Sequence, residues 1–122
     1  MSAIICNYAV LRFQPYLDTG EFANLGIIML CNNGDFLQRV ETTTRKRITH
    51  FFDKLPAQVF IQARQQFVKE LQRTVDLANN HKGQLDVQLN IFNDLVEPRE
   101  AMFRFSKPGT LAANSPIDAL DE

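Results

Sequence analysis

The sequence predicts one α+β domain over residues 1–122, in which an N-terminal antiparallel β-meander packs on a long amphipathic helix. A further short strand is expected near the C-terminus. Three observations predict this class: apolar runs separated by turn residues before residue 41, one apolar stripe at helical spacing after residue 55, and a length of 122 residues. A chain of that length forms one domain and buries roughly two-thirds of its unfolded surface.

Residues 4–13 predict the first strand, because both of their alternating faces are largely apolar, as in a strand that is covered on both sides. The strand should end near Phe13, since Pro15 cannot donate a hydrogen bond to a ladder. Residues 14–21 then have turn chemistry, with Asp18 and Gly20 as the expected pivots.

Two more strands are predicted at 22–31 and 36–40. Between them lies the sequence Asn-Asn-Gly-Asp at 32–35, in which Asn-Gly readily adopts the positive φ angles of a tight primed turn. The first 40 residues therefore read as a three-stranded meander.

The long helix is predicted at 56–79, after a polar connector in which a short helix at 45–53 is a further possibility. Pro56 suits the first helical turn, and Asn79-Asn80 followed by Gly83 suits the stop. Apolar residues near i, i+4 spacing form the stripe that should face the sheet. They are Leu55, Val59, Phe60, Ala63, Phe67, Leu71, Val75 and Ala78.

The C-terminal third leaves one alternative open. Apolar residues alternate with polar ones over 85–91, which favours a strand, yet Ile91, Leu95 and Val96 are also compatible with a short helix before Pro98. Residues 101–105 predict a short strand that Pro108-Gly109 would break. A capped helix is expected from about residue 115, either frayed or truncated, because the chain stops at Glu122 after less than two turns.

Composition narrows the function classes. The net charge of −1 gives no overall attraction to nucleic acid or acidic membranes, and the longest apolar run, 25–31, is too short to span a bilayer. Cys6 and Cys31 lie in apolar runs, which predicts buried reduced thiols in a cytoplasmic protein. The sequence has no phosphate-binding glycine loop, no metal-ligand spacing and no nucleophile motif, so we expect no cofactor, no metal and no catalytic residue.

One basic run, Arg45-Lys46-Arg47, could contact phosphate groups and is the only feature that suggests nucleic-acid binding. No second basic patch and no interleaved aromatic residues accompany it. A solvated connector is the preferred interpretation of this run, and we expect nucleic acid not to be a partner.

The candidate binding residues cluster at the head of the second strand. Glu21 and Asn24 are polar positions in an otherwise apolar run, and Gly26 in the strand interior indicates a bulge or a close backbone approach. Arg12 would lie near them if the first two strands pair, although sequence does not fix whether Arg12 and Asn24 share a face. These side chains either bind an anionic or amide-bearing group or hold the loop together.

A second polar motif, Arg99 and Glu100 after Pro98, could join the same cluster. With it, the set would offer acid, base and anion-binding groups.

The run from Tyr8 to Phe13, followed by Pro15 and by Gly-Glu-Phe-Ala-Asn-Leu-Gly at 20–26, resembles the start of a bacterial family known as domain of unknown function 3037. The Pro-Arg-Glu at 98–100 and the segment from Pro116 to Asp121 are similar to later elements of that family. The resemblance implies no established activity. It does imply a protein partner, because members are often encoded beside proteins resembling HipA-type kinases.

Two hypotheses therefore follow from the sequence. The first is a non-catalytic accessory protein that acts with a protein partner, possible candidates being HipA-type kinase-like proteins. The second is a ligand-binding protein or enzyme that uses Arg12, Glu21, Asn24, Arg99 and Glu100.

Overall fold

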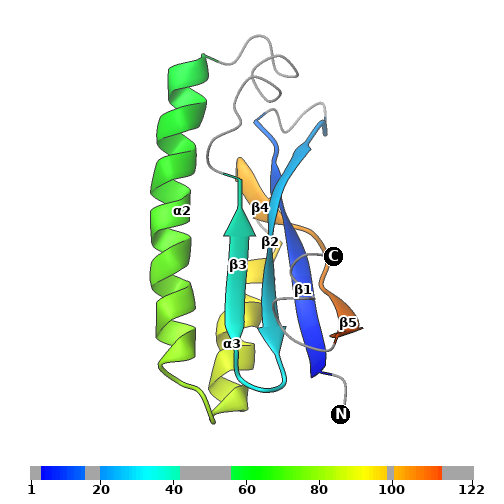
Figure 1. The fold of residues 1–122 in the computed structure, drawn as a ribbon. Coiled ribbons are helices and arrows are strands. Elements are labelled where there is room, and N and C mark those ends of the chain that lie inside the picture. Colours follow the sequence, from blue (N-terminus) through cyan, green and yellow to red (C-terminus); the bar gives the residue numbers. More distant parts are fainter. Residues whose placement is uncertain (1–3, 16–19, 42–55, 99–100, 114–122) are drawn as a thin grey trace.

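The described residues of the computed structural model, 4–15, 20–41, 56–98 and 101–113, form an antiparallel sheet with two helices beside it (Figure 1). The five strands have the order β3-β2-β1-β4, with β5 also paired to β1. The elements are β1 (Ile4–Phe13), β2 (Ala23–Cys31), β3 (Phe36–Val40), α2 (Ala57–Asn79), α3 (Leu85–Val96), β4 (Phe103–Phe105) and β5 (Gly109–Ala113).

The predicted α+β class and meander are confirmed. β1 and β3 have the predicted bounds, β2 starts one residue later than predicted, and α2 fills the predicted long helix. The basic run 45–47, the short helix at 45–53 and the terminal helix from about 115 lie outside the described residues.

The stretch 85–96 is a helix throughout, so the strand favoured for 85–91 is wrong. The helical alternative holds because the buried residues of α3, Gln88, Phe92 and Val96, follow one another at steps of four. Leu85, the first apolar residue of the alternating stretch, lies on the exposed side of the helix, at 41% exposure.

The β2–β3 hairpin is confirmed, but its turn is not the predicted primed one. Gly34 N–H donates to Cys31 C=O at 2.9 Å, and Cys31 N–H donates to Asp35 C=O at 2.9 Å. Gly34 alone in this loop has a positive φ, 95°. This is the three-residue hairpin loop with a glycine bulge, in which only the glycine needs the left-handed conformation.

Gly26, in the interior of β2, lies at both a β-bulge and a close backbone approach, the two features predicted from a glycine inside a strand. Leu11 pairs with Gly26 whereas Arg12 pairs with Asn24, so Leu25 is the extra residue of a β-bulge. A Cβ on Gly26 would also overlap the Arg39 carbonyl oxygen of β3. The bulge directs Leu25 into the core and leaves Asn24 directly opposite Arg12.

The core lies between the sheet and the helices in two adjoining clusters. One centres on Ile28, Phe36 and Phe92, and the other on Phe13 and Phe60, whose ring centroids are 4.8 Å apart. Most of the predicted α2 stripe faces this core.

Two positions of α2 differ from the predicted stripe. Val59 is 47% exposed, whereas Arg64 is buried with its guanidinium 4.8 Å from the centre of the Phe60 ring. Arg64 therefore joins the aromatic cluster through a cation–π contact of its guanidinium.

β5 was not predicted, because Pro108-Gly109 was read as a break. It is instead a bend within one long edge: β4 pairs with the end of β1 and β5 with its start. Ser106 joins them, since its N–H donates to Val10 C=O at 2.8 Å and its Oγ accepts from Val10 N–H at 2.9 Å.

The other face of the sheet has its own buried cluster of Cys6, Met29 and Cys31. Cys6 and Cys31 are directly opposite in the β1–β2 register, with Cα atoms 4.0 Å apart, and form a disulfide. The expectation of reduced thiols is therefore wrong, because pairing of the strands places the two sulfur atoms in contact.

Candidate functional site

The strongest polar arrangement lies on the sheet face away from the helices, at the end of β1. Arg12 pairs with Asn24 of β2 on one side and with Arg104 of β4 on the other. Residues directly opposite one another in antiparallel strands point to the same face. We call Arg12, Asn24 and Arg104 the arginine row.

The two arginines of this row have few partners. The Arg12 guanidinium lies 4.4 Å from the centre of the Phe22 ring, and Arg104 Nε donates to Ala101 C=O at 3.0 Å. Arg12 Nε and Arg104 Nη2 are shielded from solvent and have no hydrogen-bond acceptor among the described residues. Two like charges therefore lie side by side with part of their donor capacity unused.

This arrangement is costly for the protein alone. Like charges opposite one another on adjacent strands destabilise a sheet, by roughly 0.2–1 kcal/mol. A shielded donor with no acceptor costs about 1–3 kcal/mol, and more when the group is charged. The cation–π contact with Phe22 offsets about 0.5–1 kcal/mol of this. A bound anion would relieve both costs.

The structure brings together two of the five predicted binding residues. Arg12 and Asn24 share a row, which settles the question of register that the sequence left open. Glu21 is exposed just before β2, next to Phe22, whose ring lies under Arg12. Arg99 and Glu100 lie outside the described residues.

Sequence reasoning missed Arg104, which supplies the second charge of the row. In the sequence, Arg104 is a single charged residue between Phe103 and Phe105. A single charged residue in a short strand does not indicate which residue of another strand lies opposite it. The pairing depends on a register of β1 with β4 that joins residues 92 positions apart, 12 and 104.

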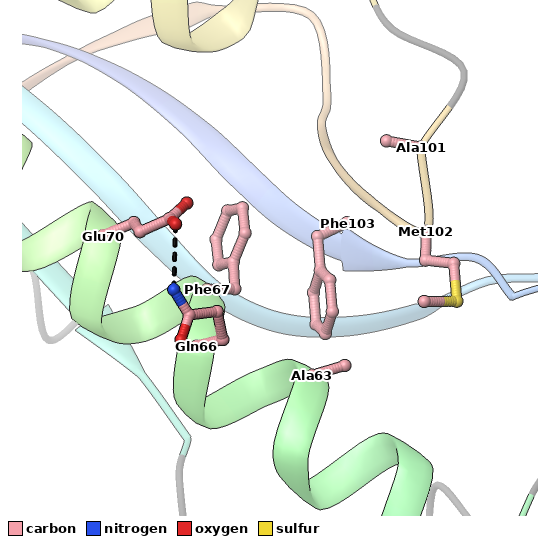
Figure 2. A pocket seen from close by; sticks show the side chains of 7 residues that line it. All are labelled: Ala63, Gln66, Phe67, Glu70, Ala101, Met102 and Phe103. Atoms are coloured by element: carbon pink, nitrogen blue, oxygen red, sulfur yellow. Dashed lines mark hydrogen bonds between the residues drawn. The ribbon is translucent and has the colours of Figure 1, made fainter.

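A second feature, a groove of about 390 Å³, lies beside the same edge of the sheet (Figure 2). We call it the α2–β4 groove. Phe67 and Phe103 stack in it, with ring centroids 4.9 Å apart and planes at 16°. The other lining residues are Ala63, Gln66, Glu70, Ala101 and Met102, and Gln66 Nε2 donates to Glu70 Oε1 at 2.9 Å.

A smaller polar pocket of about 210 Å³ lies at the opposite end of the sheet, beside the hairpin turn. Its inner residue is the fully buried Gln88, whose Nε2 donates to Gly34 C=O at 2.7 Å and to Ala78 C=O at 2.9 Å. These bonds fasten α3 to the hairpin turn and to the last turn of α2. Gln88 therefore has a structural role here.

At the hairpin turn, a hydrogen bond from Lys82 lowers the pKa of the Asp35 carboxyl against the opposing effect of burial. Within the described residues, no group of three His, Cys, Asp or Glu side chains is placed to hold a metal ion.

None of the described helices combines the length and apolar character that crossing a membrane requires. At the β4 edge of the sheet, the face away from the helices has two guanidinium groups and one amide, and the helix face has an apolar groove.

The family model described as protein of unknown function (DUF3037) matches residues 8–122, which is nearly the whole chain. The chain belongs to this family, as the sequence resemblance indicated. No curated protein and no solved structure matches it.

Proposed function

We propose that this protein is a non-catalytic accessory module that binds a protein partner, and that the arginine row contacts an acidic group of that partner. The observation that carries the proposal is the pairing of Arg12 with Arg104, with shielded guanidinium nitrogens that lack acceptors in the described part of the chain.

A carboxylate fits this row better than other acceptors. Arginine presents parallel N–H groups whose spacing matches the two oxygens of a carboxylate, and such charge-assisted bonds are about twice as strong as neutral ones. Asn24 places an amide on the other side of Arg12, on the same face of the sheet. The resemblance described above makes a HipA-type kinase-like protein the first partner to test.

The test is co-purification and titration of a HipA-type kinase-like protein with the native chain and with the variants Arg12→Gln and Arg104→Gln. Loss of one charged hydrogen-bonding group should weaken binding by about 10-fold or more. Arg73→Gln, on the exposed side of α2, is the matched control and should stay within about twofold of the native protein. Equal binding by all four proteins would refute a role of the row.

The second candidate is a receptor for a small free anion, and the same unused donors favour it. Inorganic phosphate would then raise the melting temperature of the native protein but not of Arg104→Gln. The variant should fold at least as well as the native chain, because it removes a repulsion between like charges. A melting curve of each variant therefore separates lost binding from lost structure.

A further inference from the structure

We infer, on the basis of the proposed function, that the partner presents its acidic group on an extended segment that pairs with the outer edge of β4 and places an apolar side chain in the α2–β4 groove. Three features of this edge lead to that inference. They are the backbone groups of β4 with no partner strand among the described residues, the groove on the helix face, and the arginines on the opposite face.

The backbone of β4 has an outer edge with which no other described strand pairs. Met102 C=O accepts from Gln14 N–H at 2.6 Å, so Met102 and, two residues on, Arg104 direct their backbone groups towards β1. Successive residues of an antiparallel strand point their N–H and C=O groups to opposite edges. Phe103 and Phe105 therefore point outward, and no strand of the described residues pairs with them there.

The two faces of β4 differ in chemistry. The side chains of Phe103 and Phe105 lie on the helix face, where Phe103 lines the groove, whereas Arg104 lies on the opposite face with Arg12. A strand added beside β4 would also direct alternate side chains to these two faces. Its residues should therefore alternate between apolar and acidic.

The groove has the form that one large apolar side chain requires. Phe67 and Phe103 form its aromatic wall, and Ala63 leaves room on the helix, as Figure 2 shows. Met102 on the other side is 38% exposed. An inserted side chain would cover Met102 and the open side of Phe103.

Charge argues against a second copy of this chain as the occupant. The two other outer strands of the described sheet are β3, with the sequence Phe-Leu-Gln-Arg-Val, and β5, with the sequence Gly-Thr-Leu-Ala-Ala, and neither contains an acidic residue. Pairing β4 with β3 of another copy would bring Arg39 to an edge that already contains Arg104, and pairing β4 with itself would oppose two copies of Arg104. A distinct partner with acidic residues satisfies the row, whereas either self-pairing adds to the repulsion.

The test uses a short synthetic peptide in which glutamate alternates with isoleucine, added to the full chain. We expect saturable binding, with shifts of the amide resonances of Phe103 and Phe105 and slower exchange of those amides. A peptide with the same composition in two separate blocks, and one with N-methylated backbone amides, should bind at least about 10-fold more weakly.

Two protein variants examine the groove itself. Ala63→Leu places a larger side chain in the groove and should weaken binding of the alternating peptide by about 10-fold, whereas Gln65→Leu adds the same side chain to the exposed side of α2 and should have little effect. Leucine is a good helix former, so both variants should keep α2 intact.

The outcomes separate this inference from the proposed function. Binding that needs Arg104 but is indifferent to residue order, N-methylation and Ala63→Leu would overturn the edge-pairing inference and leave the acidic partner standing. Binding that is unchanged in Arg12→Gln and Arg104→Gln would refute the proposed function. Absence of any binding by the alternating peptide, while the kinase-like partner still binds through Arg104, would also overturn the edge-pairing inference.

Discussion

Charged side chains of this protein meet in two ways that have opposite consequences for stability. In the arginine row, two positive charges are neighbours across β1 and β4. At the hairpin turn, Lys82 Nζ lies 2.6 Å from Asp35 Oδ1, and Asn33 Nδ2 donates to Asp35 Oδ2 at 3.0 Å. The second arrangement is complete within the chain, so we expect it to act on stability alone.

The Asp35–Lys82 pair gives a prediction with a defined pH dependence. The hydrogen bond from Lys82 places the folded-state pKa of Asp35 below its ordinary value of 3.8, so the pair stabilises the fold above that pH. The contribution is lost as the pH falls through the folded-state pKa. Asp35→Asn should lower the free energy of unfolding by about 0.2–1 kcal/mol at neutral pH and by nothing at about pH 2.

Urea titrations of Asp35→Asn, Lys82→Gln and the double variant would measure this. The two single losses should be similar, and the double variant should lose no more than either, because each substitution breaks the same pair. A loss of equal size at neutral and acidic pH would show that the effect does not come from the charge of Asp35.

At the scale of residues, the sequence predicted two members of the arginine row, Arg12 and Asn24, but not the third, Arg104. Arg12 and Asn24 were selected because polar residues interrupt apolar strands, and Gly26 correctly marked a bulge. The sequence does not show that Arg12 and Asn24 lie on the same face of the sheet. One extra residue in a strand moves the side chains on one side of the bulge to the opposite face. Arg104 was missed for a related reason, since its importance lies in a neighbour that is distant in sequence.

At the scale of elements, the edge formed by β4 and β5 depends on Ser106. Its backbone and side chain both bond to Val10, so the ladder continues where the two strands change direction. Without the hydroxyl, the Val10 N–H would face the bend with no acceptor. This connection holds β4, and with it Arg104, in register with β1.

Ser106→Ala should therefore lower the free energy of unfolding by about 1–2 kcal/mol, because it leaves a partly buried N–H without its acceptor. Ser106→Thr keeps the hydroxyl and is the matched control. Hydrogen exchange of the Val10 amide should be faster in Ser106→Ala and close to native in Ser106→Thr. Unchanged exchange in both variants would mean that the hydroxyl does not hold this edge.

Elements with strong periodicity were predictable and those that depend on tertiary pairing were not. The stripe of α2 and the apolar runs of β1 and β3 define those elements locally. α3 was ambiguous because its apolar residues fit two periods over 85–91. β5 has only one large apolar residue, Leu111, and it is a strand because its backbone pairs with β1.

At the scale of the molecule, Phe67 connects the two core clusters on the helix face. It packs against both clusters, and its ring lies 4.9 Å from that of Phe103 and 6.2 Å from that of Phe105. Sheet and helices should therefore lose their structure together, since few apolar contacts of one cluster can persist once the other has opened.

Phe67→Ala tests whether the domain unfolds as one unit. Because Phe67 is only partly buried, we expect a loss of about 2–4 kcal/mol, slightly below that of a fully buried phenylalanine, with one transition seen alike by near- and far-ultraviolet circular dichroism. Phe22→Ala removes an exposed ring outside both clusters and should cost about 1 kcal/mol or less. Two separate transitions in the native protein would show that the two clusters unfold independently. The contacts of Phe67 would then not be enough to make the clusters unfold together.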